Sequence, residues 1–265
     1  MINNISYNNS KIYYKTIGNS KKTIVLLHGY LESIEIWNSF AEKLSENYKL
    51  IIPDLPGHGK SDVLNNEASV DEMAEVVKQI VVKEQVEKCA MIGHSMGGYV
   101  LLAFLENHFH FLDAITLFHS SPYSDSDDKK KNRDREIEII KAGKKLQIYK
   151  NHFPKIFAEQ NINKYKLEIT KYIEIAKNMN NKGVIYALNA MKNRKNRADL
   201  LKNTQIPVQY IIGEKDNFIP MSILKKIKFP NNTTIDILKE SGHLGFVEEK
   251  EKSISIIKKF YIHNS

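Results

Sequence analysis

The 265-residue sequence contains one cysteine, seven prolines and no long apolar stretch. Because Cys89 has no second cysteine to pair with, an internal disulfide is excluded, and a reducing cytoplasm is the expected location. No apolar run approaches the roughly 20 residues that a membrane-spanning helix needs. Residues 1–5 also lack the basic start and the apolar stretch of a signal peptide. We therefore expect no membrane insertion.

Patterns that bind metals, nucleotides or nucleic acids are also missing. No group of histidines and cysteines has metal-ligand spacing, and neither a P-loop nor a G-x-G-x-x-G fingerprint is present. No basic run is interleaved with aromatic residues in the manner of a nucleic-acid-binding module. The sequence thus predicts no cofactor, no metal and no nucleic-acid partner.

Short apolar runs alternate with helical stretches along most of the chain. Strands are expected at residues 23–27, 48–53, 88–92, 114–118, 208–212 and 233–238, with a hairpin over 5–18 that turns at 8–10. Strands that are separated by helices predict an α/β fold with a mostly parallel sheet and helices on both of its faces. A chain of this length can bury a sizeable core.

The alternation breaks between Pro122 and Arg197, where apolar residues recur at helical spacing and no strand pattern is found. This predicts an all-helical cap, residues 122–197, inserted into a core of residues 1–121 and 198–265. The cap carries 19 Lys and Arg against 9 Asp and Glu, whereas the rest of the chain has a net charge of −2. Such a segment is either an ordinary solvated helical surface or an electropositive entrance for anionic substrates or an acidic acyl carrier protein.

The most informative motif is Gly93-His94-Ser95-Met96-Gly97-Gly98, which lies between a strand-like and a helix-like run. Ser95 has a glycine two positions before it and another two positions after it. This G-x-S-x-G pattern is typical of a strained strand-to-helix turn that presents a serine hydroxyl as a nucleophile. The same residues could also be a helix N-cap among turn glycines. The choice between a nucleophile and a helix N-cap depends on whether a base and an acid are present elsewhere in the sequence.

Both are present, each directly after a predicted strand. His243 follows the run 234–238, and Asp216 follows the run 208–212. With triad candidates in the order Ser95, Asp216, His243, the chain resembles the α/β-hydrolase family. The segments His28-Gly29-Tyr30 and Asp54-Leu55-Pro56-Gly57-His58-Gly59-Lys60-Ser61-Asp62 resemble two further loops of that family.

The resemblance implies an esterase-like serine hydrolase with a helical cap. Ser95 would be the nucleophile, His243 the general base, and Asp216 the acid that orients it. The backbone N–H groups of Tyr30 and Met96 would form the oxyanion hole. Relatives that open epoxides or displace halides carry aspartate at the position of Ser95, so serine indicates acyl transfer to water.

Other residues compete for these roles. Asp125 is an alternative acid, at a position that the family uses less often. His94 and His28 are expected to be structural, His28 by bracing its loop. Residues near the motifs or in the cap are expected to line a substrate pocket: Leu31, Trp37, His119, Phe153, Phe157, Leu188, Phe218 and Leu244.

Together these features predict a cytoplasmic hydrolase that cleaves small carboxylic esters through an acyl-enzyme intermediate. The alternatives are a thioesterase or acyl-carrier-protein ester hydrolase, a lactonase, and a non-enzymatic receptor for small molecules on the same fold.

Overall fold

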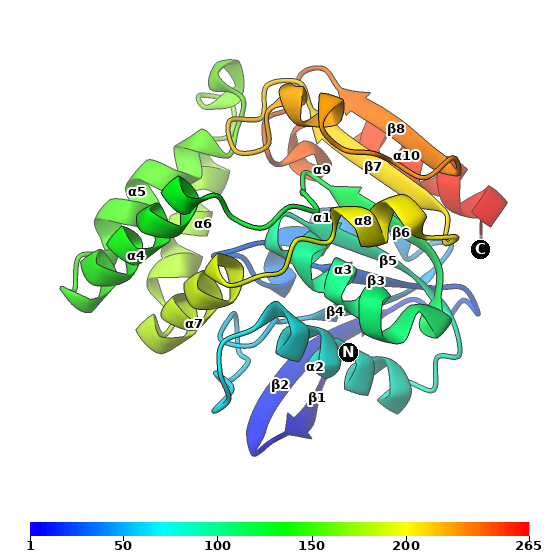
Figure 1. Ribbon diagram of the computed structural model, residues 1–265, viewed down its shortest axis with the longest axis horizontal. Helices are drawn as coiled ribbons and strands as arrows, with labels where there is room; N and C mark the ends of the chain where they lie inside the picture. Colours follow the sequence, from blue (N-terminus) through cyan, green and yellow to red (C-terminus); the bar gives the residue numbers. More distant parts are fainter. Residues whose placement is uncertain (265) are drawn as a thin grey trace.

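Eight strands form one sheet in the order β1-β2-β4-β3-β5-β6-β7-β8 (Figure 1), in a computed structural model that describes residues 1–264. The strands are β1 Ile2–Tyr7, β2 Ser10–Ile17, β3 Thr23–Leu27, β4 Lys49–Pro53, β5 Cys89–His94, β6 Leu112–Phe118, β7 Val208–Gly213 and β8 Thr233–Leu238. Only β2 runs antiparallel to its two neighbours, and the other pairs are parallel. The mostly parallel sheet predicted from the apolar runs is confirmed.

The predicted hairpin is β1 and β2, and its turn has a physical reason. Asn8 and Asn9 both have positive φ, 47° and 63°. Asparagine tolerates this left-handed region better than other residues with a side chain, and two such residues in a row are typical of a tight hairpin turn.

Helices cover both faces of the sheet, with α2, α3 and α8 on one face and α1 and α10 on the other (Figure 1). The α-helices are α1 Asn38–Leu44, α2 Val70–Lys83, α3 Met96–His108, α4 Asp127–Lys141, α5 Lys145–Lys155, α6 Lys166–Lys177, α7 Asn181–Lys192, α8 Ala198–Asn203, α9 Gly245–Glu248 and α10 Lys250–Asn264. The first ten residues of α3 are all buried, because this helix packs against β3, β5 and β6 and against α2.

Helices α4 to α7, residues 127–192, lie between β6 and β7 in the chain, and we call them the inserted helices. They gather beside the sheet, at the left of Figure 1. Within the described residues, no strand interrupts the expected cap segment, 122–197. Arg197 ties its end to the core: its guanidinium hydrogen-bonds to Asp71 of α2 at 2.6 Å and to Glu106 of α3 at 2.8 Å.

The carboxyl ends of the parallel strands β3, β5, β6 and β7 meet at one edge of the sheet, next to the inserted helices (Figure 1). In α/β sheets this edge is where ligands bind, because the loops that follow neighbouring strands converge there. Over the part of the chain that the structure describes, no helix is both long enough and apolar enough to cross a membrane.

Candidate active site

Ser95 occupies a strained turn between β5 and α3. Its φ of 48° and ψ of −112° lie in a region that residues with a side chain rarely adopt. The neighbouring strand end holds this backbone in place. The Ser95 N–H donates to the Phe118 carbonyl at 3.0 Å, and the Ser120 hydroxyl donates to the Ser95 carbonyl at 2.8 Å. Such strain persists where surrounding contacts determine it, and it is common at functional sites.

The glycines around Ser95 are required by close backbone approach. A Cβ atom on Gly93 would lie 2.6 Å from the Gly97 carbonyl oxygen. A Cβ on Gly97 would overlap the Leu27 carbonyl of β3, and one on Gly98 would overlap the Ser120 hydroxyl. The motif therefore combines a sharp turn with direct packing of α3 onto the sheet.

Asp216 and His243 are joined at the same edge of the sheet. His243 Nδ1 lies 2.8 Å from one carboxylate oxygen of Asp216. The other oxygen accepts hydrogen bonds from the N–H groups of Phe218, at 2.7 Å, and Ile219, at 3.0 Å. Burial alone would raise the pKa of Asp216, but the charge of His243 and hydrogen bonds from His119 and His243 outweigh it and hold that pKa well below its usual range. Asp216 is therefore ionised at neutral pH.

A second histidine, His119, contacts the same carboxylate from behind. It is fully buried, and its Nδ1 lies 3.2 Å from the Asp216 oxygen that also contacts His243. The Gly245 N–H donates to its Nε2 at 3.1 Å, which favours the tautomer with the proton on Nδ1, although the Gly213 N–H also lies 3.1 Å from Nδ1. Burial lowers the pKa of His119 to about 4, so this ring is neutral at pH 7.

These contacts leave the Asp216 carboxylate without a vacant position. Two rings and two amide groups surround its oxygens, and a carboxylate accepts about four hydrogen bonds. Although His119, Asp216 and His243 bring their ligand atoms close together, the occupied lone pairs fit a hydrogen-bond network better than a metal site.

His94 and Glu32 connect the Ser95 turn to the loop after β3. His94 Nδ1 lies 3.0 Å from a Glu32 oxygen, and its Nε2 lies 2.9 Å from the His243 carbonyl. The same Glu32 oxygen accepts the Gly29 N–H at 2.5 Å. Burial would raise the pKa of Glu32, but His94 and this N–H outweigh it, so the pKa is lowered. The expected structural role of His94 is confirmed.

His28 braces its loop, as predicted. Its Nε2 accepts the Leu55 N–H at 2.9 Å, and its Nδ1 lies 2.8 Å from the Gly29 carbonyl. This leaves neither nitrogen free to serve a substrate.

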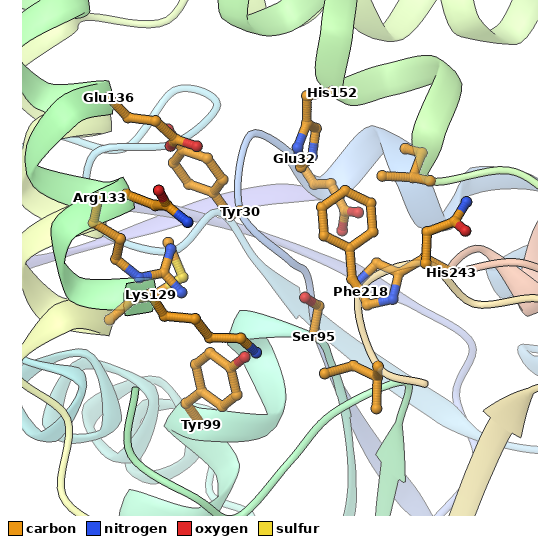
Figure 2. Close-up of a pocket in the computed structure, with 15 residues that line it drawn as sticks. Tyr30, Glu32, Ser95, Tyr99, Lys129, Arg133, Glu136, His152, Phe218 and His243 are labelled. Atoms are coloured by element: carbon orange, nitrogen blue, oxygen red, sulfur yellow. The ribbon is translucent and has the colours of Figure 1, made fainter. Parts of the chain in front are cut away.

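Ser95 and His243 face a cavity of about 280 Å³ between the sheet edge and the inserted helices (Figure 2). Its walls are Tyr30, Glu32, Ser95, Tyr99, Lys129, Asn132, Arg133, Glu136, His152, Ile156, Met191, Asn217, Phe218, Ile219 and His243. The Ser95 hydroxyl points into this space beside the His243 ring (Figure 2), although no hydrogen bond joins the two in the described structure. Such bonds are often long before substrate binds.

The backbone N–H groups of Tyr30, a cavity residue, and of Met96, which follows Ser95 in the chain, have no acceptor in the part of the chain that the structure describes. Among the described residues, neither Tyr30 N–H nor Met96 N–H donates a hydrogen bond. Met96 is the first residue of α3, where N–H groups lack partners within the helix and the helix dipole is positive. Tyr30 itself lines the same cavity as Ser95.

Comparison with known proteins agrees with the fold. A family model for the alpha/beta hydrolase fold matches residues 22–135. An AB hydrolase superfamily protein of Bacillus subtilis, YisY, is 24% identical over 264 residues, which cover 94% of each chain. A thermophilic esterase from Thermogutta terrifontis is 22% identical with a TM-score of 0.93 over 100% of both chains. An enol-lactonase from Burkholderia xenovorans LB400 is 14% identical with a TM-score of 0.90, covering 98% of this chain and 100% of the other. The chain has the α/β-hydrolase fold.

Of the eight pocket residues predicted from the sequence, Phe218 lines the cavity and the other seven do not. His119 lies behind Asp216. Leu188 and Leu244 are fully buried in the core. Leu31 and Phe153 face a separate, very small crevice. The expectation that apolar residues near the motifs would line the cavity is therefore corrected, because most of them complete the core instead.

The two remaining aromatic residues of the predicted pocket are also packed against other rings and do not line the cavity. Trp37 packs against Phe246 with ring centroids 4.3 Å apart, and Phe157 stacks on Tyr165 at 5.2 Å. Large aromatic rings bury the most apolar area when they are enclosed on all sides. A position in the core is therefore more favourable for them than a position on the cavity wall.

The carboxylate of Asp125, the alternative acid, pairs with two arginines and not with His243. Arg194 donates to its carboxylate at 2.6 Å, and Arg133 donates to the other oxygen. Burial would raise the pKa of Asp125, but these two guanidinium groups outweigh it and lower the pKa. The alternative is wrong, because this carboxylate belongs to an arginine cluster.

Polar residues of the cavity wall were missing from the sequence prediction. Lys129, Asn132, Arg133 and Glu136 share one face of α4, and His152 of α5 lies above Ser95 (Figure 2). Burial and the charge of His243 lower the pKa of His152 to about 4. The spacing of three, four and seven residues along α4 was the available signal, because such positions share one helix face.

Proposed function

We propose that this enzyme hydrolyses carboxylic esters through an acyl-enzyme intermediate on Ser95. The observation that carries the proposal is the 2.8 Å contact between His243 and the buried Asp216 carboxylate, at the same cavity into which the strained Ser95 points. A serine hydroxyl is a weak nucleophile at neutral pH, so it needs a base beside it and an acid that orients the base.

In the first half of the proposed reaction, His243 takes the Ser95 proton as the hydroxyl oxygen attacks the ester carbonyl. The negative charge that forms on the carbonyl oxygen is received by the N–H groups of Tyr30 and Met96. His243 then returns the proton to the leaving alcohol, and the acyl group remains on Ser95. In the second half, His243 activates a water that releases the acid.

We also propose that residues 122–197 act as a cap over a core of residues 1–121 and 198–265. Support comes from the cavity wall, because Lys129, Arg133 and His152 of the inserted helices face Ser95. A cytoplasmic location, suggested by the single buried cysteine, belongs to the same proposal. The comparisons lend no support to an acyl carrier protein as partner.

The test is turnover of a panel of nitrophenyl esters, acyl-CoA thioesters and lactones by the wild type and Ser95→Ala. We expect turnover of esters that Ser95→Ala lowers by at least about a thousandfold. Ser45→Ala, which changes a serine at the end of α1, is the matched control and should retain full activity. Full esterase activity in Ser95→Ala would contradict the mechanism. Ligand binding without turnover of any of these substrates would favour the receptor alternative.

A further inference from the structure

One wall of the cavity is polar and has no part in the proposed reaction. It consists of Lys129, Asn132 and Arg133, with Glu136 one turn further along α4. Figure 2 shows Lys129 and Arg133 extending from this helix on the side of the cavity where Tyr99 lies, with the Lys129 side chain ending beside Tyr99. A charged wall opposite a nucleophile is a substrate-recognition surface if its charges are not already neutralised.

Arg133 is only partly neutralised. Its guanidinium pairs with Asp125 through Nε and Nη2, and the Asp125 side chain is completely buried. Arg194 pairs with the same carboxylate at 2.6 Å, and it also lies over the Tyr99 ring at 3.9 Å. Two guanidinium groups share one carboxylate, so the cluster keeps a net positive charge. Nη1 of Arg133 donates to none of the described residues, so it is free for a ligand.

Lys129 has no acidic partner of its own. Its ammonium group makes no hydrogen bond or ion pair with any of residues 1–264, although it lines the cavity. The hydroxyl of Tyr30, in the same cavity, is likewise buried without a hydrogen-bond partner in the described structure. Burial raises the pKa of Tyr30 well above its usual value, so this hydroxyl stays a donor. An ammonium, a guanidinium N–H and a phenol are therefore donors without acceptors in one cavity.

Two carboxylates line the same cavity: Glu32, which is already engaged by His94 and the Gly29 N–H, and Glu136, which opposes these cations. The pKa of Glu136 is raised by burial, and the nearby Arg133 lowers it by less. Further basic groups surround the cavity: a second pocket shares Asn132, Glu136, His152 and Phe218 with it and adds Arg135 and Lys155. In these two adjoining pockets the basic side chains therefore outnumber the one carboxylate, Glu136, that has no hydrogen-bond partner among the described residues.

We propose that the substrates of this site are carboxylic esters that carry a second, free carboxylate, bound by Lys129 and Arg133. This inference rests on the proposed function, since it concerns what Ser95 attacks. A carboxylate has two oxygens and accepts from both cations at once, whereas a neutral ester leaves their charges unpaired. The free carboxylate can sit in the acyl part or in the alcohol part of the ester.

The first experiment compares kcat/KM for matched anionic and neutral esters. For charge in the acyl part the pair is the mono-nitrophenyl ester of adipic acid and nitrophenyl hexanoate. For charge in the alcohol part it is 4-acetoxybenzoate and 4-acetoxytoluene. We expect the wild type to prefer the anion by about tenfold or more in at least one pair.

Three variants test whether the charged residues of the cavity wall cause the preference for anionic esters. Lys129→Met should bring the anionic-to-neutral ratio close to one, and Glu136→Gln should raise it because an opposing acid is removed. Lys131→Met, on the same helix but outside the cavity wall, should keep the wild-type ratio. A wild-type ratio near or below one in both pairs would overturn the carboxylate site while leaving ester hydrolysis intact.

The second experiment does not depend on turnover. Calorimetry measures binding of monomethyl adipate, which carries one free carboxylate, and of neutral methyl hexanoate to Ser95→Ala protein, with and without Lys129→Met. We expect monomethyl adipate to bind about tenfold more tightly than methyl hexanoate, and the difference to disappear with Lys129→Met. Equal affinity for the two esters would overturn the proposal even if no ester were hydrolysed. Absence of ester turnover together with tight binding of monomethyl adipate would instead refute the proposed function alone.

Discussion

Replacing Asp216 by asparagine should reverse the hydrogen bonds that orient His243. One oxygen of Asp216 accepts the N–H groups of Phe218 and Ile219, at 2.7 and 3.0 Å. In Asp216→Asn the amide oxygen must take this place, because an NH₂ group there would face two other donors. The amide nitrogen then faces His243 Nδ1 and His119 Nδ1 with one hydrogen for each.

His243 would in turn adopt the wrong tautomer. Its Nδ1 would accept from the asparagine, so Nε2 would carry the proton and could not take one from Ser95. The negative charge that stabilises the imidazolium would be lost as well. Both effects act on the same step, and we expect kcat/KM for a nitrophenyl ester to fall about 10⁴-fold, which is about 5 kcal/mol of transition-state stabilisation.

The assay is steady-state hydrolysis at pH 7.5, with circular dichroism to show that the variant is folded. Glu214→Gln is the matched control, because Glu214 is an exposed carboxylate two residues earlier and should be replaceable without loss. Asp216→Asn activity within tenfold of wild type would refute the orientation argument.

Three predictions concern stability. Gly98→Ala should lower the midpoint of urea unfolding, because the new Cβ overlaps the Ser120 hydroxyl; an unchanged midpoint would contradict that packing. Burial lowers the pKa of His58 to about 3 and that of His119 to about 4. These values lie below the unfolded value of about 6.5, so the unfolded state binds more protons there, and Tm should fall between pH 6.5 and 4. A flat Tm over this range would exclude buried neutral histidines. Arg197→Met should cost about 1–3 kcal/mol of unfolding free energy, because Asp71 and Glu106 lose the buried cation that they share and keep only the exposed Lys195. Arg135→Met, which removes an exposed arginine, should cost little.

The elements that were predicted well depend on short-range patterns. The strands of the sheet are runs of five to eight residues bounded by turns, and β3 and β8 have the predicted ends. The turn at Ser95 could be predicted because the spacing of its glycines is a local pattern, although the contacts that require Gly97 and Gly98 come from Leu27 and Ser120 elsewhere in the sequence. His28 and His94 were expected to be structural because of their places in the chain: His28 lies in the loop after a predicted strand, and His94 directly precedes Ser95 on the same turn.

The cavity wall could not be predicted because it depends on how distant segments meet. Phe153 and Phe157 lie close in the sequence to the cavity residues His152 and Ile156, yet both pack against other aromatic residues of the same segment. The face of α4 that reaches the cavity is polar, whereas apolar residues were expected there. The role of His119 was hidden for the same reason, since its contact with Asp216 joins residues that are far apart in the sequence.

The central claim is that Ser95 is the nucleophile, and covalent labelling tests it most directly. The wild type would be incubated with a fluorophosphonate and examined by intact mass spectrometry and peptide mapping. We predict a single adduct on Ser95 that is absent in Ser95→Ala and unaffected by Ser45→Ala. A folded wild type that forms no adduct, or forms one on another residue, would contradict this account.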